Sequence, residues 1–126
     1  MLRSLPPRGT SFNIISFGSR HSSLFRSSAP YSADSVKKAS SHVDTMRADH
    51  GGTEIRAALE EAFKSRSSPS TPASVFVLTD GEAYDLDGVQ ACVAAAVAKS
   101  KVAKVLLRLF CLGIGNSVSK VIIHLY

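Results

Sequence analysis

Several features that define other protein classes are missing from this chain of 126 residues. No apolar run approaches the roughly 18 to 20 residues of a membrane-spanning helix, which excludes a membrane span. The two cysteines, Cys92 and Cys111, show neither C-x-x-C nor zinc-ligand spacing. Both lie among apolar residues in the sequence, which favours reduced thiols over a disulfide or a metal site. We therefore expect an intracellular, cytoplasmic protein.

Acidic residues are also missing from the first 33 positions, which hold four arginines and carry a charge of +4. The remaining residues hold eleven basic and ten acidic side chains, which adds +1 to reach the net charge of +5. A basic, serine-rich, acid-free start is typical of a mitochondrial transit peptide. A core strand predicted over residues 12–18 argues against a removable leader. No basic patch interleaved with aromatics occurs, so we expect no nucleic-acid partner.

What is present is the composition of one globular domain, with 44% hydrophobic residues. Apolar runs predict strands over residues 12–18, 74–79 and 105–115, and helical spacing predicts helices over 33–46, 53–66, 87–100 and 117–126. Ten serines between positions 16 and 41 indicate a surface connection. Strands that alternate with helices predict an α/β fold with a mostly parallel sheet.

Three of these segments predict specific packing. The helix over 53–66 has one apolar stripe, a Glu60–Lys64 pair at i,i+4 spacing and Thr53 at its N-cap. The helix over 33–46 has Val36, Ala39, Val43 and Met46 at helical spacing, which predicts a modestly amphipathic helix. The continuous apolar run 74–79 is typical of a parallel strand covered on both faces.

Asp80 follows that buried strand directly, within "VFVLTDGE". In parallel α/β sheets, ligands bind at the carboxyl ends of the strands, so the Asp80 carboxylate should lie at a functional edge. An Asp-Gly turn explains the same residues without any ligand. Thr53 follows Gly51 and Gly52 at a helix start, where its hydroxyl either caps the helix or offers an oxygen to a hard cation.

Four segments read in order like consecutive blocks of one family: "LRSLPPRGTSFNIISFGS", "GGTEIRAAL", "VFVLTDGE" and "RLFCLGIGNSVSKVII". Together they resemble the von Willebrand factor type A domain, in the form found with inter-alpha-trypsin-inhibitor-type modules. The resemblance covers residues 1–126 and implies a doubly wound, Rossmann-like α/β sheet. It also implies a binding module whose metal-ion-dependent adhesion site engages an acidic group of a partner protein.

Carried onto this sequence, the resemblance makes Thr53 and Asp80 ligands of Mg²⁺ or Mn²⁺. Both offer oxygen atoms, which these hard cations prefer. Four further positions are implied to line the site loops, with Glu82 as an outer-shell contributor: Gly51, Gly52, Gly81 and Glu82.

The sequence departs from the family because no Asp-x-Ser-x-Ser occurs in it. The metal site is therefore incomplete, and two protein oxygens should hold Mg²⁺ poorly. The family's central first strand is also missing, so either the strands 12–18 and 74–79 pair directly or the fragment is unstable. Both ends stop within a pattern, and we expect a truncated domain or an incomplete gene model. The alternative function is a metal-free structural or interaction remnant of such a domain.

Signals for catalysis are weak. The G-x-G of "LFCLGIGNSVSK" has Val118 where a dinucleotide-binding turn needs its third glycine. Asp85 and Asp87 lie too far from the strand end to act as a phosphatase nucleophile, and fit better as caps of the next helix. The four histidines show no paired ligand spacing, and no G-x-S-x-G elbow occurs. We therefore expect a binding protein and not an enzyme.

Overall fold

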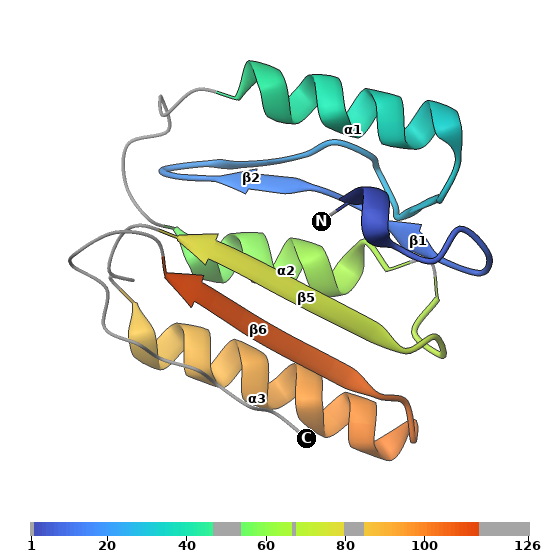
Figure 1. Ribbon diagram of the computed structural model, residues 1–126. Helices are drawn as coiled ribbons and strands as arrows, with labels where there is room; N and C mark the ends of the chain where they lie inside the picture. Colours follow the sequence, from blue (N-terminus) through green and yellow to red (C-terminus); the bar gives the residue numbers. More distant parts are fainter. Residues whose placement is uncertain (1, 47–53, 67, 80–84, 114–126) are drawn as a thin grey trace.

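The structure, a computed structural model, describes residues 2–46, 54–66, 68–79 and 85–113. They contain both helices and strands, which confirms the α/β class (Figure 1). In chain order the elements are a 3-10 turn η1 (Leu2–Ser4), β1 (Ser11–Phe12), β2 (Ile15–Phe17), β3 (His21–Ser23), β4 (Ala29–Pro30), α1 (Ala33–Thr45), α2 (Ile55–Lys64), β5 (Ala73–Thr79), α3 (Leu86–Val102) and β6 (Leu107–Gly113). The helix predicted over 117–126 lies outside the described residues.

The single strand predicted over residues 12–18 is wrong, because Asn13 divides it into β1 and β2. The Asn13 side-chain oxygen accepts hydrogen bonds from the backbone N–H groups of Ile14 (2.9 Å) and Phe25 (3.0 Å), and its amide donates to the Phe25 carbonyl (2.8 Å). A side chain that bonds nearby backbone groups competes with the strand ladder. β1 then pairs antiparallel with β4, and β2 pairs antiparallel with β3. The serine-rich segment thus supplies two strands.

Helix α1 forms over nearly the predicted residues. It begins with a capping box in which the Ser32 hydroxyl accepts from the Ser35 backbone N–H (3.1 Å) and the Ser35 hydroxyl accepts from the Ser32 backbone N–H (2.9 Å). Ala39 is fully buried, as expected. Val43 and the C-cap residue Met46 are 46% and 48% exposed, so the apolar stripe is not covered at the end of this helix.

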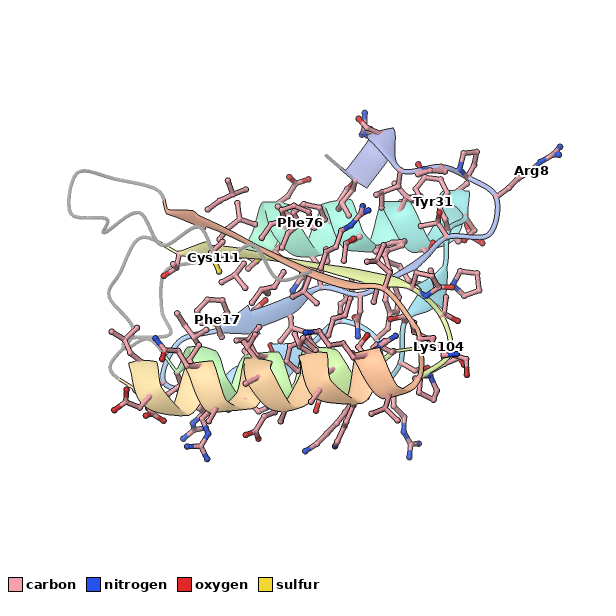
Figure 2. The ribbon with its side chains drawn as sticks, turned by 90° about the horizontal axis from the view of Figure 1, so that it is seen from below. Arg8, Phe17, Tyr31, Phe76, Lys104 and Cys111 are labelled. Atoms are coloured by element: carbon pink, nitrogen blue, oxygen red, sulfur yellow. The ribbon has the colours of Figure 1, made fainter. Side chains whose placement is uncertain are left out.

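Strands β5 and β6 are parallel and in register over their full lengths, from Ala73 opposite Leu107 to Thr79 opposite Gly113. Their burial alternates: Val77 is 6% exposed, whereas Phe76 and Leu78 are 44% and 50% exposed. The expectation that both faces are covered is therefore wrong for the described residues. Figure 2 shows Phe76 on the side of the strands away from α3, where its ring stacks on Phe110 with centroids 4.8 Å apart.

The core lies on the other face, where α2 and α3 meet β5 and β6. Its buried members come from all four elements: Ile55, Leu59, Val77, Val93 and Leu109. Phe17 of β2 packs against the same cluster. Helix α2 therefore joins the antiparallel pair β2–β3 to the parallel pair β5–β6.

The edges of β2 and β5 do not pair with each other. Among the described residues, β2 forms its ladder with β3 alone and β5 with β6 alone. The hydrogen-bonded strands thus form one parallel and two antiparallel pairs in place of a continuous parallel sheet. Direct pairing of the two edges, one outcome expected from the sequence, is not formed.

Two leucines of β6 test the position of the core. Leu109 is 4% exposed and Leu112 is 48% exposed. We expect Leu109→Ala to lower the free energy of unfolding by about 2 to 5 kcal/mol, because it leaves a cavity in the core. Leu112→Ala is the matched control and should change the free energy by about 0.5 kcal/mol or less. Urea denaturation followed by circular dichroism measures both, and equal losses would contradict this assignment of the faces.

Candidate functional site at the carboxyl edge of the strands

The carboxyl ends of β2, β5 and β6 and the starts of α2 and α3 lie at one edge of the molecule, on the left of Figure 1. β5 and β6 end together, with Thr79 opposite Gly113. The backbone N–H of Glu54, immediately before α2, donates to the carbonyl of Gly18, which follows β2 (2.8 Å). This is the edge at which α/β sheets bind ligands.

The six residues predicted to form the site lie outside the described residues, so their geometry stays a prediction. They fall in two segments that enter helices at this edge: Gly51, Gly52, Thr53, Asp80, Gly81 and Glu82. The described neighbours Glu54, Thr79 and Asp85 lie at the carboxyl edge.

The start of α2 corrects one part of the prediction. The N-cap is Glu54 and not Thr53, and the Glu54 side chain makes no capping hydrogen bond. Thr53 itself lies outside the described residues, so its role stays a prediction.

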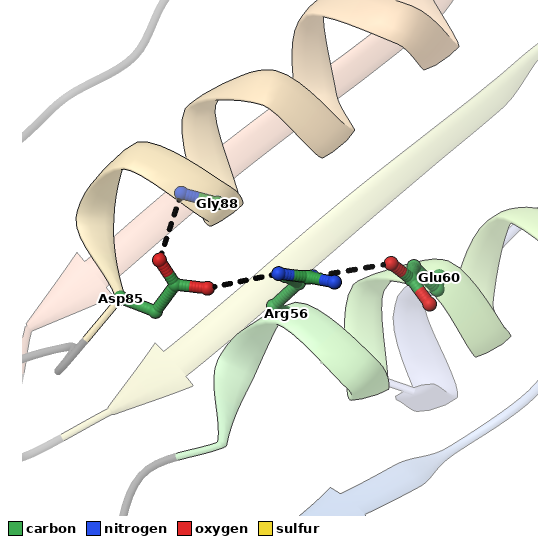
Figure 3. A network of polar contacts seen from close by, with 4 residues as sticks. All are labelled: Arg56, Glu60, Asp85 and Gly88. Atoms are coloured by element: carbon green, nitrogen blue, oxygen red, sulfur yellow. Dashed lines mark hydrogen bonds and ion pairs between the residues drawn. The ribbon is translucent and has the colours of Figure 1, made fainter.

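A polar network connects the starts of the two helices (Figure 3). Arg56 in the first turn of α2 donates through Nη1 to Asp85 Oδ2 (3.1 Å) and through Nε to Glu60 Oε1 (3.3 Å). Asp85 is the N-cap of α3, and its Oδ1 accepts from the Gly88 backbone N–H (2.9 Å). The capping role predicted for Asp85 is confirmed.

These contacts shift the ionisation of both charged partners. The hydrogen bond from Gly88 and then that from Arg56 lower the pKa of the Asp85 carboxyl, because each favours the carboxylate. The contacts with Asp85 and Glu60 raise the pKa of Arg56. Since both oxygens of Asp85 accept hydrogen bonds from the protein, Asp85 is not a free cation ligand.

Arg56 was not found by sequence reasoning, which paired Glu60 with Lys64. The structure pairs Glu60 with Arg56, four residues before it, so the predicted pair is wrong. The i,i+4 spacing of Arg56 and Glu60 was a usable signal. Nothing in the sequence indicated the contact between Arg56 and Asp85, which are 29 residues apart.

A second polar contact lies between β2 and α1. Ser16 is 5% exposed, and its hydroxyl lies 3.1 Å from Nε2 of His42. No carboxylate among the described residues bonds to the His42 ring, so this contact does not form a Ser-His-Asp arrangement there. The contact between Ser16 and His42 connects β2 to α1.

The cysteines are both free and partly buried. Burial raises the pKa of the Cys92 and Cys111 thiols, which keeps them protonated and unreactive near neutral pH. Within the described ranges, no group of three or more His, Cys, Asp or Glu side chains is placed to hold a metal ion. No helix in this part of the chain has the length and apolar character needed to cross a membrane.

The ionisation of Asp85 gives a pH test. Its pKa is lower in the folded chain than the ordinary value of about 3.9, so its stabilising effect is complete above that pH and is lost as the pH falls through the lowered pKa. Asp85→Asn keeps a capping oxygen and removes the charge. We expect the melting temperature of the wild type to exceed that of Asp85→Asn near neutral pH, with a difference that shrinks in acid. A difference that does not shrink as the pH falls through the acid range would contradict this origin.

Comparison with known proteins supports the family expected from the sequence. The profile described as von Willebrand factor type A domain matches residues 1–125. Human von Willebrand factor A domain-containing protein 5A is 36% identical over 119 residues, 94% of this chain and 14% of the relative. A von Willebrand factor A domain-containing protein of Dictyostelium discoideum is 34% identical over 122 residues, 97% of this chain and 12% of the relative. The chain thus spans only a small part of these relatives.

Proposed function

This chain belongs to the von Willebrand factor type A domain family, and from that premise we propose that it binds an acidic group of a partner protein through a divalent cation. Family membership supports the coarser function of a protein-interaction module. The cation, the acidic group and the absence of catalysis are parts of the proposal. So are the cytoplasmic location and the association with an inter-alpha-trypsin-inhibitor-type module.

The observation that supports this function best is the convergence of two helix starts at the carboxyl edge. The segment that contains Thr53 enters α2, and the segment that contains Asp80 leaves β5 and enters α3. Arg56 and Asp85 connect these starts at 3.1 Å. The Thr53 hydroxyl and the Asp80 carboxylate are ligand types that suit Mg²⁺ or Mn²⁺.

The donor set also determines how strong the site can be. Asp85, the nearest described carboxylate after Asp80 in the sequence, is engaged by Gly88 and Arg56, so it does not add a third oxygen. Mg²⁺ keeps several waters and needs near-octahedral geometry, and two protein oxygens make a weak site. A bound cation would have coordination positions that the protein does not fill, and the partner's carboxylate would occupy one of them. Binding of the cation and of the partner should then strengthen each other.

Thermal unfolding with and without cation tests this function. We expect millimolar Mg²⁺ or Mn²⁺ to raise the melting temperature of the wild type, because a ligand that binds only the folded state stabilises it. Asp80→Ala should abolish the rise, and Thr53→Ala should reduce it. Asp87→Ala, which removes an exposed carboxylate from the first turn of α3, is the matched control and should keep the rise.

An equal rise in wild type and Asp80→Ala would remove Asp80 from the site. If no cation raises the melting temperature of the wild type, the alternative function applies. The chain would then be a metal-free structural or interaction remnant of the family, with Asp80 and Gly81 serving as a strand-to-helix turn.

A further inference from the structure

The loop between α2 and β5 holds a pair of residues that the proposed function does not use. We propose that Thr71 in this loop is a phosphorylation site for a proline-directed protein kinase, and that the guanidinium of Arg66 binds the resulting phosphate. This site lies apart from the proposed cation site and does not depend on it.

The sequence of the loop is the kind that such kinases select. The chain has five prolines, and two of them directly follow a hydroxyl residue, in Ser68-Pro69 and Thr71-Pro72. Proline has no backbone N–H, so it enters an apolar kinase pocket without leaving a donor unpaired. Thr71 also has Pro69 two residues before it. The fixed φ of this second proline lowers the entropy that the segment loses when a kinase orders it.

The position of Thr71 makes it accessible to a kinase. Thr71 is exposed, as are Pro69, Ser70 and Pro72 around it. Figure 1 shows the loop on the right, at the amino end of β5 and away from the carboxyl edge of the strands. The Thr71 backbone N–H donates to the carbonyl of Ser68 (3.2 Å), which closes a short turn. A kinase can open this turn without breaking a helix or a strand ladder.

Ser68 is a poorer site than Thr71. It is half-buried, and its hydroxyl oxygen accepts a hydrogen bond from the Ser70 backbone N–H (3.2 Å). Ser68 and Pro69 also occupy the first two positions of the turn, where serine and proline are favoured for structural reasons. The turn thus accounts for Ser68-Pro69, whereas Thr71 contributes only its backbone N–H to it.

Arg66 is held beside Thr71. Its Nη2 donates to the carbonyl of Pro69 (3.3 Å) and to the carbonyl of Thr71 itself. Its Nε is buried and has no hydrogen-bond partner among the described residues. A buried donor without a partner is uncommon in folded proteins and indicates that a group is missing from its surroundings.

The charge of Arg66 is also uncompensated. None of the ion pairs between described residues includes Arg66. Lys64 and Arg66 are the two charged residues between Glu61 and Asp80, so this stretch of sequence supplies no carboxylate. An anion on the loop would therefore meet a guanidinium that is already close to the loop and has an unused donor.

A phosphate on Thr71 has the properties of that missing anion. It carries a charge of about −1.5 to −2 near neutral pH and has three acceptor oxygens. It would be attached to the residue whose carbonyl the guanidinium already contacts. A guanidinium binds phosphate through paired, charge-assisted hydrogen bonds, which are stronger than its present bonds to neutral carbonyls.

The reaction is a phosphoryl transfer from ATP. Oγ1 of Thr71 forms a bond to the γ-phosphorus, and the bond from that phosphorus to the bridging oxygen breaks, which releases ADP. The hydroxyl proton passes to the catalytic base of the kinase. The phosphate would then connect the loop before β5 to Arg66, which lies just beyond the C-cap Ser65 of α2. Such a contact orders a loop.

Modification of the folded full chain tests the site. The chain is incubated with ATP, Mg²⁺ and a purified proline-directed kinase of the mitogen-activated class, and mass spectrometry locates the phosphoryl group. We expect Thr71 to be modified in the wild type and in the matched control Ser68→Ala. Modification should be lost in Thr71→Ala and fall by about tenfold in Pro72→Ala.

A synthetic peptide of residues 64–76 shows whether the fold hides the loop. The folded chain and the peptide should be modified at similar rates. Modification of the peptide but not of the folded chain, modification of neither, or modification of Ser68 in place of Thr71 would each overturn the assignment of this site.

Phosphorus NMR of the modified chain tests the part played by Arg66. The second pKa of a phosphothreonine is about 6. It should be lower in the wild type than in the modified peptide by about 0.2 to 0.7, because a nearby guanidinium favours the dianion. Arg66→Gln should return the pKa to the value of the peptide, and Arg66→Lys should keep part of the difference.

Arg20→Gln is the matched control, since it removes the same charge from an exposed position after β2, at the opposite edge of the molecule. It should keep the pKa of the wild type. Equal values in wild type and Arg66→Gln would show that Arg66 does not bind the phosphate and would overturn that part of the inference.

Discussion

The packing of α2 against the strands is the interaction on which the rest of this structure depends. Its residues Ile55 and Leu59 are in one buried cluster with Val77 of β5 and Leu109 of β6, and Phe17 of β2 packs against that cluster. Since β2 and β5 share no hydrogen bonds among the described residues, the apolar stripe of α2 connects them through side chains. Apolar burial is non-directional, so it can hold together strands whose ladders are separate.

The same arrangement leaves β5 and β6 with two different faces. One face is buried under α2 and α3, and the other exposes Phe76, Leu78 and Leu112. Apolar side chains on a solvent-facing sheet surface are unusual for parallel strands, which are normally covered on both sides. In the described residues the stacking of Phe76 on Phe110 removes part of this surface from water.

The packing of α2 and α3 also brings the helix starts to the carboxyl edge, and this placement connects the fold to its proposed function. A carboxylate after β5 and a hydroxyl before α2 are useful to a cation only if they approach each other. The hydrogen bond from Glu54 to Gly18 connects the start of α2 to the end of β2, and the ion pair of Arg56 with Asp85 connects the starts of α2 and α3.

The sequence by itself determined the helices α1, α2 and α3, the strands β5 and β6, and the family, because periodic apolar residues and ordered motifs act locally along the chain. It also indicated the Asp85 cap, whose partner is three residues away. Tertiary structure decided the break at Asn13, the exposure of Phe76 and Val43, and the contacts Ser16–His42 and Arg56–Asp85. Each of these depends on residues distant in sequence, and periodicity within one segment does not specify which distant side chain will cover or bond to it.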